Sequence, residues 1–448
     1  MSSHGRYAPE NLIDTGKLKH HKGDVIQLVD KLSDPSIRAA WESDILNSSK
    51  LKIVDLFCGA GGMSEGFVNA GFTVAAAFDH DSEACNTFRG NIPASVFPGD
   101  IEQVIDASLL LKNIGATAIT VIVGGPPCQG FSHVGRARIQ SLDPKNQAKL
   151  FAKNELHTHF FRFVENLRPT FFVMENVPAL INFESGAYMD AIMEISERLG
   201  YKVVRQILNA VDYGVPQNRR RLIVVGAKEG YTFDWPDIIP TSDRVTLEQA
   251  IGDLPFVEPP SLIEQLDYDL QKTQSSYQKY MRNKVRSEDK PFVYDHVVRP
   301  AREDDIIIFS NMKPGQKYTD VPPQYRRYNS ASFTDKYYML KPDSPGITIT
   351  AHLSKDGYRY IHYDPKQHRT ISVREAARTQ SFGDHFRFAG SRSSRFRQIG
   401  NAVPPLLAEN IARQIQKAIH NAQEKQQSSH VEPFMEHFSY LNEGSAAD

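Results

Sequence analysis

The sequence predicts an α/β fold, with a doubly wound parallel sheet and a smaller, irregular second domain. Short apolar, β-branched runs alternate with segments of helical spacing from Lys52 to Val225, which is the pattern of successive βαβ units. The alternation stops near Tyr231, where a stretch rich in Pro, Asp, Tyr and Arg begins. Regular structure returns at Arg369 and ends in a helix after Pro405. We therefore expect one α/β domain interrupted by an inserted domain.

The composition is that of a globular intracellular protein. The 448 residues predict two or three domains; 40% of them are apolar and 23% charged. A net charge of −1 excludes a uniformly polybasic nucleic-acid binder, so any basic surface must be local. Three cysteines do not form a closed disulfide framework and lack zinc-ligand spacing. Without an apolar run long enough for a membrane or a signal peptide, we expect a cytoplasmic protein.

The regular elements follow from the apolar periodicity. Apolar spacing from Val25 to Leu46 predicts short helices packed on the main body; a small DNA-binding appendage is the alternative, although basic residues do not cluster there. The expected strands are 53–57, 74–78, 96–97, 119–123, 171–174, 201–205 and 221–225. Helices are expected at 63–70, 82–89, 157–167, 369–380 and 405–422. The domain boundaries that we expect are 1–49, 50–230, 231–365, 366–422 and 423–448, the last being a polar, disordered tail.

A glycine-rich turn, DLFCGAGG from Asp55 to Gly62, joins the first strand to a helix. Such a turn lets a ligand approach the backbone at a helix N-terminus, but alone it is a weak signal. Asp79 ends the second strand, where a carboxylate reaches ribose hydroxyls in nucleoside-binding folds. Asp100 follows the next strand and could accept from an adenine amino group. Together these sites favour an adenosine-containing cofactor over a purely structural turn.

The motif GGPPCQGFS, Gly124 to Ser132, follows another buried strand. Its prolines stiffen the turn and its glycines allow close backbone approach, so Cys128 is held at the carboxyl end of the sheet. By itself the motif leaves two interpretations open: a nucleophile, or a buried structural thiol.

Two further polar motifs belong to the same sheet edge. Glu175 ends an apolar strand. In that position it is either a helix cap or a desolvated general acid beside a thiol. In the run from Gln217 to Arg221, strand alternation directs Arg219 and Arg221 to one face and Arg220 to the other. These arginines would form a solvated basic edge or hold an anionic or carbonyl-bearing substrate.

In this order, the motifs resemble those of the DNA cytosine-5 methyltransferases. The resemblance covers residues 51–418 and rests on DLFCGAGG, Phe78-Asp79, Gly99-Asp100-Ile101, GGPPCQGFS, Met174-Glu175-Asn176-Val177, Gln217 with Arg219 and Arg221, Arg374 to Arg378, and QIGNAVP from Gln398 to Pro404. It implies a Rossmann-like S-adenosylmethionine methyltransferase core, split as 50–230 and 366–422, with residues 231–365 as the target recognition domain and 1–49 as a helical extension. Asp79 stands where a glutamate is more usual, which shortens the reach but keeps the charge. Gly383-Asp384 stands where many members have a proline.

The resemblance also assigns site residues by motif position. Phe57 would stack on adenine, Asp79 would hold the ribose, Asp100 with Ile101 would read the adenine edge, and Asn401 with Val403 would close the site. The full cofactor shell implied is Phe57, Gly59, Ala60, Gly61, Asp79, His80, Asp100, Ile101, Pro127, Asn401 and Val403. The catalytic set implied is Cys128, Glu175, Arg219, Arg221 and Gln217, and no metal is expected.

The implied chemistry requires these residue types. Cytosine C5 is a poor nucleophile until a thiolate adds to C6, so Cys128 would supply covalent catalysis. Its thiol must be activated, because a free cysteine has a pKa of about 8.5. Glu175 would protonate N3, Arg219 would hold O2, and Arg221 would brace the glutamate or the catalytic loop. A duplex hides C6, so the base must be flipped out, and residues 132–151 would form a loop that closes over it.

The partner is expected to be double-stranded DNA, bound by a monomer that serves a restriction-modification system, with a companion endonuclease that need not touch it. Arg326, Arg327, Arg359, His362 and Lys366 are candidate DNA contacts. One alternative is an RNA cytosine-5 methyltransferase, but the Cys-Phe-Thr signature of that branch is reduced here to Ser332-Phe333-Thr334. The other is a catalytically idle DNA-binding regulator, against which the retained Cys128, Glu175 and Arg219 argue.

Overall fold

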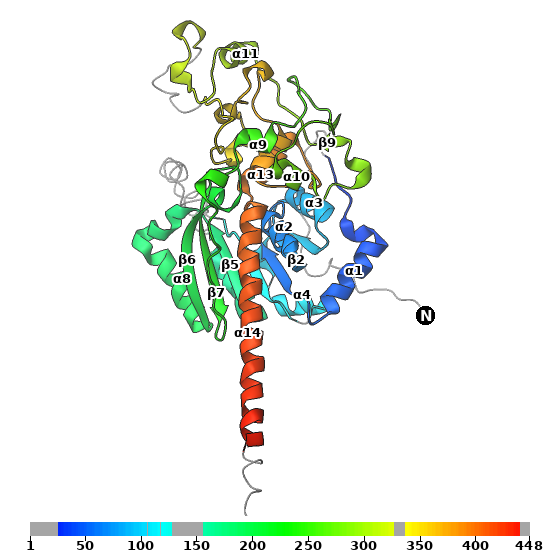
Figure 1. The fold of residues 1–448 in the computed structure, drawn as a ribbon, viewed down its shortest axis with the longest axis vertical. Helices are drawn as coiled ribbons and strands as arrows, with labels where there is room; N and C mark the ends of the chain where they lie inside the picture. The colour runs from blue at the N-terminus through cyan, green and yellow to red at the C-terminus, as the bar shows by residue number, and fades with distance from the viewer. Residues whose placement is uncertain (1–25, 105, 117, 128–155, 327–336, 440–448) are drawn as a thin grey trace, which may run out of the picture.

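The computed structural model describes residues 26–104, 106–116, 118–127, 156–326 and 337–439 (Figure 1). Cys128 and the loop expected at 132–151 lie outside the described residues, as do Arg327 and the Ser332-Phe333-Thr334 tripeptide.

A seven-stranded sheet forms the centre of the described chain. Its strand order is β3-β2-β1-β4-β5-β7-β6. The strands are β1 (Lys52–Leu56), β2 (Thr73–Asp79), β3 (Ser95–Pro98), β4 (Val121–Gly124), β5 (Phe171–Asn176), β6 (Tyr201–Asn209) and β7 (Arg220–Lys228). The order reverses beside β1, so β1 and β4 lie at the topological switch point, where doubly wound sheets bind ligands. The α/β class predicted from the sequence is confirmed.

The sheet is mixed, which corrects the expectation of a wholly parallel one. β1, β2, β3, β4 and β5 pair in parallel, whereas β7 is antiparallel to both β5 and β6. β7 follows β6 after a short 3-10 turn, Ala210–Tyr213, with no helix between them. A parallel return needs a crossover of a dozen or more residues, so this short connection reverses the strand.

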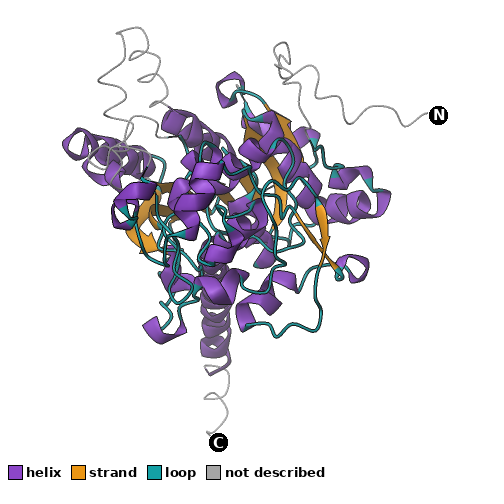
Figure 2. Cartoon of the chain, turned by 90° about the horizontal axis from the view of Figure 1, so that it is seen from above, coloured by secondary structure: helices purple, strands orange, loops and turns teal. Residues whose placement is uncertain are grey.

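Helices cover both faces of the sheet, and Figure 2 shows the strands between them. One face packs on α2 (Gly62–Asn69), α3 (Ser82–Asn91) and α14 (Pro405–Ser439). The other packs on α1 (Pro35–Leu46), α7 (Leu156–Leu167) and α8 (Ala187–Arg198), with α4 (Ala107–Asn113) beside α7. Neighbouring strand residues therefore serve different cores: Ile53 belongs to the first and Val54 to the second.

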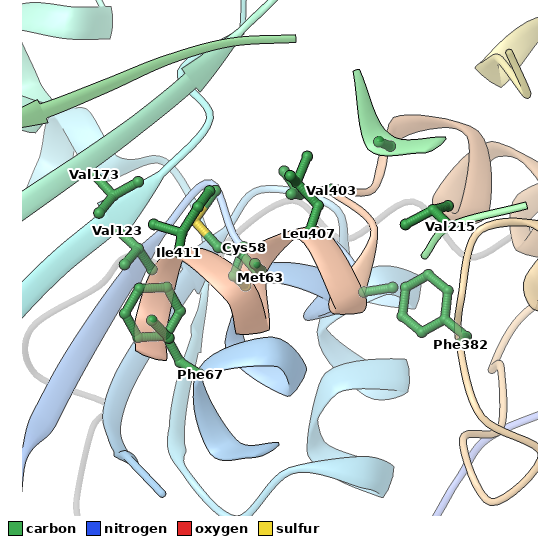
Figure 3. Packing of buried hydrophobic residues seen from close by; sticks show 14 of the residues in the cluster. Cys58, Met63, Phe67, Val123, Val173, Val215, Phe382, Val403, Leu407 and Ile411 are labelled. Carbon is green, nitrogen blue, oxygen red and sulfur yellow. The ribbon is translucent and has the colours of Figure 1, made fainter. Parts of the chain in front are cut away.

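The return of the chain after residue 366 completes the first core. Leu407 and Ile411 of α14 lie against Met63 and Phe67 of α2 in the same buried cluster (Figure 3). The two helices approach closely because residue 66 is a glycine: a Cβ there would collide with the Pro405 carbonyl and the Ala408 side chain. Segments more than 300 residues apart in the sequence thus share one core.

A helix lies near each end of the described chain. The N-terminal segment contains the expected helix, α1, whose Trp41 is buried and donates from Nε1 to the Val74 carbonyl at 2.8 Å. At the other end, α14 continues to Ser439 and projects from the molecule (Figure 1). This corrects the expectation that the helix ends near Ala422 and a disordered tail follows. Its residues have no glycine or proline that would end a helix before Pro433.

The described region between β7 and α12 is built from short helices and one small sheet. They are α9 (Leu247–Ile251), α10 (Ser276–Arg282), α11 (Glu303–Ser310) and the two-stranded sheet of β8 (Gln265–Asp267) and β9 (Phe292–Tyr294). The chain then enters α12 (Val373–Thr379) and α13 (Arg392–Asn401). Figure 1 shows these elements gathered above the sheet, beyond its carboxyl edge.

Buried ion pairs organise this upper region. Arg378 of α12 is fully buried and donates from Nε and Nη2 to the Asp384 carboxylate, at 2.8 and 2.7 Å, and also pairs with Asp253. Arg374 pairs with Asp295 at 3.1 Å. Because buried charges must be paired, these contacts tie Asp253 and Asp295 of the inserted region, and Asp384 of the segment that follows it, to one helix.

In the described part of the chain, none of the helices is both long and apolar enough to cross a membrane.

Candidate active site

The turn between β1 and α2 forms one wall of the site. Phe57, Gly59 and Gly61 all have positive φ, at 59°, 53° and 96°. Glycine adopts this backbone without strain, whereas Phe57 is held there by its surroundings. A Cβ built on Gly59 would meet nothing within 4 Å, so the backbone at this point faces open space. The turn is thus shaped to receive a ligand at the N-terminus of α2.

Asp79, at the end of β2, is oriented toward this turn. Its Oδ2 accepts from the Gly59 amide at 2.8 Å and its Oδ1 accepts from the Asp81 amide at 2.8 Å. Each carboxylate oxygen accepts more than one hydrogen bond, so the fixed carboxylate retains acceptor capacity for hydroxyl donors. The neighbouring His80 side chain is exposed and lies 3.3 Å from Oδ1.

The loop after β3 places Asp100 and Ile101 at the same edge. Asp100 is exposed and caps a short 3-10 turn by accepting from the Glu102 amide at 3.0 Å, while Ile101 is buried. Arg162 of α7 donates from Nη2 to the Ile101 carbonyl at 2.9 Å. Arg162 was not among the expected site residues. No sequence motif indicates it, because its contact with Ile101 depends on the packing of α7 beside this loop.

The returning segment closes the turn from the other side. A Cβ on Gly62 would collide with the carbonyl oxygen of Val403, so the two backbones are in contact. Val403 is buried and Asn401 is exposed at the end of α13. Ala60 is buried within the turn. The structure therefore brings the expected cofactor residues from four separate segments to one edge of the sheet.

Glu175 and Arg221 form the polar centre of the neighbouring wall. Arg221 Nε lies 2.6 Å from Glu175 Oε1 in an ion pair, and both side chains are nearly buried, at 14% and 13% exposure. A Cβ on Gly125 would lie 3.0 Å from Glu175 Oε2, so the carboxylate lies against the glycine that opens the GGPPC turn. Asn176 donates from Nδ2 to the Pro126 carbonyl at 3.1 Å and so fixes the same turn. Pro127, the last described residue before Cys128, is half-buried.

Arg219 lies elsewhere, which differs from its expected role at a substrate carbonyl. Its side chain is 0% exposed, and it donates to the carbonyls of Ile349 at 2.6 Å, Gly400 at 3.0 Å and Ala402 at 2.9 Å. Burial, followed by the nearby charge of Arg221, lowers its pKa well below the usual value. With its guanidinium directed at three backbone carbonyls, Arg219 braces the returning segment instead of facing open space.

Gln217 is likewise a buried connector. Its amide oxygen accepts from the Ile349 amide at 2.7 Å, and its Nε2 donates to the Thr379 carbonyl at 3.1 Å and to Gln380 Oε1 at 2.5 Å. Arg220, in contrast, is exposed, as the predicted strand alternation requires. Of the Gln-x-Arg-x-Arg motif, only Arg221 reaches the Glu175 carboxylate.

The two described cysteines are structural in their surroundings. Cys58 and Cys85 are both free and buried. Burial raises the pKa of both thiols, so neither is a ready nucleophile. The expected nucleophile, Cys128, lies outside the described residues, directly after the turn that Gly125 and Asn176 position.

A glycine-rich turn at the switch point, an acidic strand end and a Glu–Arg pair lie at one edge of a Rossmann-like sheet, the edge at which doubly wound enzymes bind their ligands. The family model of C-5 cytosine-specific DNA methylases matches residues 51–417. The chain belongs to this family and is a DNA (cytosine-5-)-methyltransferase.

Similar proteins agree with this assignment. The Type II methyltransferase M.AgeI of Thalassovita gelatinovora is 32% identical, over 82% of this chain and 100% of its own length. The Type II methyltransferase M.XorII of Xanthomonas oryzae pv. oryzae is 35% identical over 83% of this chain and 86% of its own. A crystal structure described as a DNA modification methyltransferase encoded within an E. coli prophage superposes with a TM-score of 0.66 at 25% identity, over 83% of this chain and 100% of that one.

Proposed function

We propose that this enzyme transfers the methyl group of S-adenosylmethionine to C5 of a flipped-out cytosine in a specific duplex DNA sequence, through a covalent adduct with Cys128. The observation that carries the proposal is the Glu175–Arg221 ion pair, whose carboxylate lies against Gly125, three residues before Cys128 in the sequence. This pair supports the proposed roles of Glu175 as proton donor and of Arg221 as carbonyl-binding cation.

The residues at the first wall fit S-adenosylmethionine. Gly59 faces open space, and Asp79 is fixed by two backbone amides with acceptor capacity left for ribose hydroxyls. Phe57 is partly exposed beside them and supplies an aromatic face for adenine. When bound there, S-adenosylmethionine would supply an electrophilic methyl group.

The residues at the second wall would activate the base. The Cys128 thiolate forms a bond to C6, and the electron pair displaced from the C5–C6 double bond moves into the ring as Glu175 gives a proton to N3. C5 is then an enamine carbon that can take the methyl group. Methyl transfer would leave S-adenosylhomocysteine as the second product. A base then removes the C5 proton, the C5–C6 double bond re-forms as the thiolate leaves C6, and N3 returns its proton to Glu175.

Arg221, rather than Arg219, is the residue we propose for the O2 carbonyl. Its Nε forms the ion pair with Glu175, and its Nη1 donates to the Arg220 carbonyl at 2.8 Å. Its Nη2 has no acceptor among the described residues. One guanidinium would therefore orient the acid and bind O2 together. Gln217 and Arg219 would act as positioning residues for the segment around Ile349.

The biological setting follows from the same family. We propose that residues 231–365 recognise the target sequence, and that a monomer modifies DNA in a restriction-modification system. Both of the bacterial relatives described above are named Type II methyltransferases, and the matching family model is that of DNA methylases, which supports that setting and the choice of DNA over RNA. A companion endonuclease would act on the same site without contacting this chain.

Methyl transfer from labelled S-adenosylmethionine tests the proposal. Duplex DNA should take up the labelled methyl group at C5 of cytosine, whereas transfer RNA should not. A Glu175→Gln variant should lose roughly 10²- to 10⁴-fold in rate, the usual contribution of a general acid, while retaining cofactor binding. Label on RNA alone, or full activity in this variant, would contradict the proposal.

A further inference from the structure

A second concave site lies away from the Glu175–Arg221 pair, between the starts of α11 and α13. It is a cavity of about 380 Å³, and both helices lie in the region above the sheet (Figure 1). Four basic side chains line it: Arg299, Arg302, Lys355 and Arg392. Neither the sequence motifs nor the proposed active site uses this cavity.

The acidic residues of the lining do not neutralise these cations. Only Asp305 and Asp356 are acidic among the lining residues, which leaves a formal excess of two positive charges. Asp305 accepts from the hydroxyls of Tyr337 at 2.9 Å and Tyr358 at 2.7 Å, and Asp356 accepts from the Tyr358 amide at 3.2 Å. Both carboxylates therefore accept hydrogen bonds within the fold, and the lining keeps its formal excess of two positive charges.

Two buried polar atoms of the lining lack partners among the described residues. They are Nε of Arg299 and Oγ1 of Thr370, whose side chain is almost wholly buried at 3% exposure. A buried polar group without a hydrogen-bond partner destabilises the fold, so two such groups in the lining of one cavity favour a ligand there. The atoms are neighbours: a Cβ on Gly357 would lie 3.2 Å from Arg299 Cζ and 3.3 Å from Thr370 Oγ1. The glycine keeps this space open.

Arg299 is held in place before any ligand arrives. Arg299 donates from Nη2 to the Leu353 carbonyl at 2.6 Å and lies over the Phe396 ring, 4.8 Å from its centre. Burial, and then the charge of Arg392, lowers the pKa of Arg299 to about 10. Arg392 is the first residue of α13, whose N-terminal amides carry partial positive charge. An anion would relieve the repulsion between the two arginines.

We propose that this cavity binds a phosphate group through Arg299, Arg302, Lys355, Arg392 and the Thr370 hydroxyl. A phosphate accepts several hydrogen bonds at once, which suits a fixed set of guanidinium and hydroxyl donors. The group belongs either to the backbone of bound DNA or to a free phosphate-bearing small molecule. The first source rests on the proposed function; the second does not.

Thr370→Val tests the binding without removing a fold contact, because the hydroxyl has no partner to lose. Inorganic phosphate should raise the melting temperature of the wild-type full-length chain, and raise it less in Thr370→Val and in Arg302→Gln, which removes an exposed cation. Lys112→Gln, an exposed lysine on α4, should respond as the wild type does. This measurement uses neither DNA nor methyl donor, so its result is independent of methyl transfer.

The salt dependence of duplex DNA binding separates the two sources. If the phosphate belongs to DNA, Arg302→Gln should reduce the slope of log affinity against log salt by about 1, and Lys112→Gln should not. An unchanged slope with a weakened phosphate response would assign the site to a free phosphate-bearing molecule. Equal phosphate responses in the wild type, Thr370→Val and Arg302→Gln would overturn the proposal.

Discussion

At the scale of single residues, neighbouring arginines have different tasks although they belong to one motif. Arg219 is enclosed by carbonyls of the returning segment, Arg220 is exposed, and Arg221 contacts the Glu175 carboxylate. Strand alternation explains why Arg220 is exposed. Arg219 and Arg221 share the other face and differ because the Ile349 carbonyl accepts from Arg219, whereas Arg221 pairs with Glu175.

Replacing each arginine by glutamine should separate these tasks. Arg219→Gln should lower the free energy of unfolding by about 3 kcal/mol or more, because buried carbonyls lose their donor. Arg221→Gln should keep its stability within about 1 kcal/mol and lose roughly 10²-fold or more in methyl transfer. Arg220→Gln, the matched control, should change stability by less than about 0.5 kcal/mol.

Urea unfolding and initial rates of methyl transfer measure the two effects. A stable but inactive Arg219→Gln, together with an active Arg221→Gln, would restore Arg219 as the residue at the substrate carbonyl.

Asp55 on β1 should make stability depend on pH. It is fully buried and accepts from the Ser64 hydroxyl at 2.6 Å; burial raises its pKa to about 7. Its folded pKa exceeds the unfolded value of about 3.9, so its contribution is fully present at low pH and is lost as pH rises through 7. From pH 5 to 8 the loss would be about 3 kcal/mol at most.

Asp55→Asn removes this ionisation, so the variant should gain stability relative to the wild type as pH rises from 5 to 8. Thermal unfolding at several pH values checks the expectation. Parallel profiles for the two proteins would show that Asp55 does not titrate in this window.

Much of the site was predictable from single residues, and the remainder was not for a physical reason. Asp79 is the last residue of an apolar strand and Glu175 the second last of another, so the periodicity alone predicts that both lie at the sheet edge. The division of labour between Arg219 and Arg221 depends on the segment at Ile349, and Arg162 acts through a helix 61 positions away from Ile101. Such contacts between distant segments leave no local pattern.

At the scale of elements, the close contact between α2 and α14 links the cofactor turn to the end of the chain. α2 begins at Gly62 in that turn, and its Gly66 touches the start of α14. The sequence predicted both helices, at 63–70 and 405–422. The reversal of β7 was not predicted, because a period of two residues gives a strand but not its direction.

Gly66→Ala and Gly66→Val should destabilise the protein in order of side-chain size. Alanine favours a helix by about 1 kcal/mol over glycine, yet the added Cβ would meet backbone atoms of Pro405 and Glu409, which cannot yield cheaply. Overpacking costs about 1–3 kcal/mol, so the net effect of alanine should be a loss and that of valine a larger one. Denaturant unfolding checks the order, and a stabilised Gly66→Ala would contradict the packing described.

At the scale of the whole molecule, the inserted region and the sheet are joined by buried polar contacts rather than by apolar surface alone. Gln217 and Arg219 connect the end of the sheet to Ile349, while Arg378 connects Asp253 to Asp384. The sequence predicted an insertion between 231 and 365, but not these connections. These contacts fix the position of the proposed recognition region relative to the Glu175–Arg221 pair.

The most direct test of the central claim is base-resolution mapping of 5-methylcytosine in DNA from cells that express this protein, beside a Cys128→Ala control. Cys58→Ser serves as the matched thiol control, because Cys58 is buried with a raised pKa and should be dispensable. We predict one short sequence methylated at C5 in the wild type and in Cys58→Ser, and unmodified in Cys128→Ala. Methylation that persists in Cys128→Ala, or DNA without 5-methylcytosine in the wild type, would contradict the account.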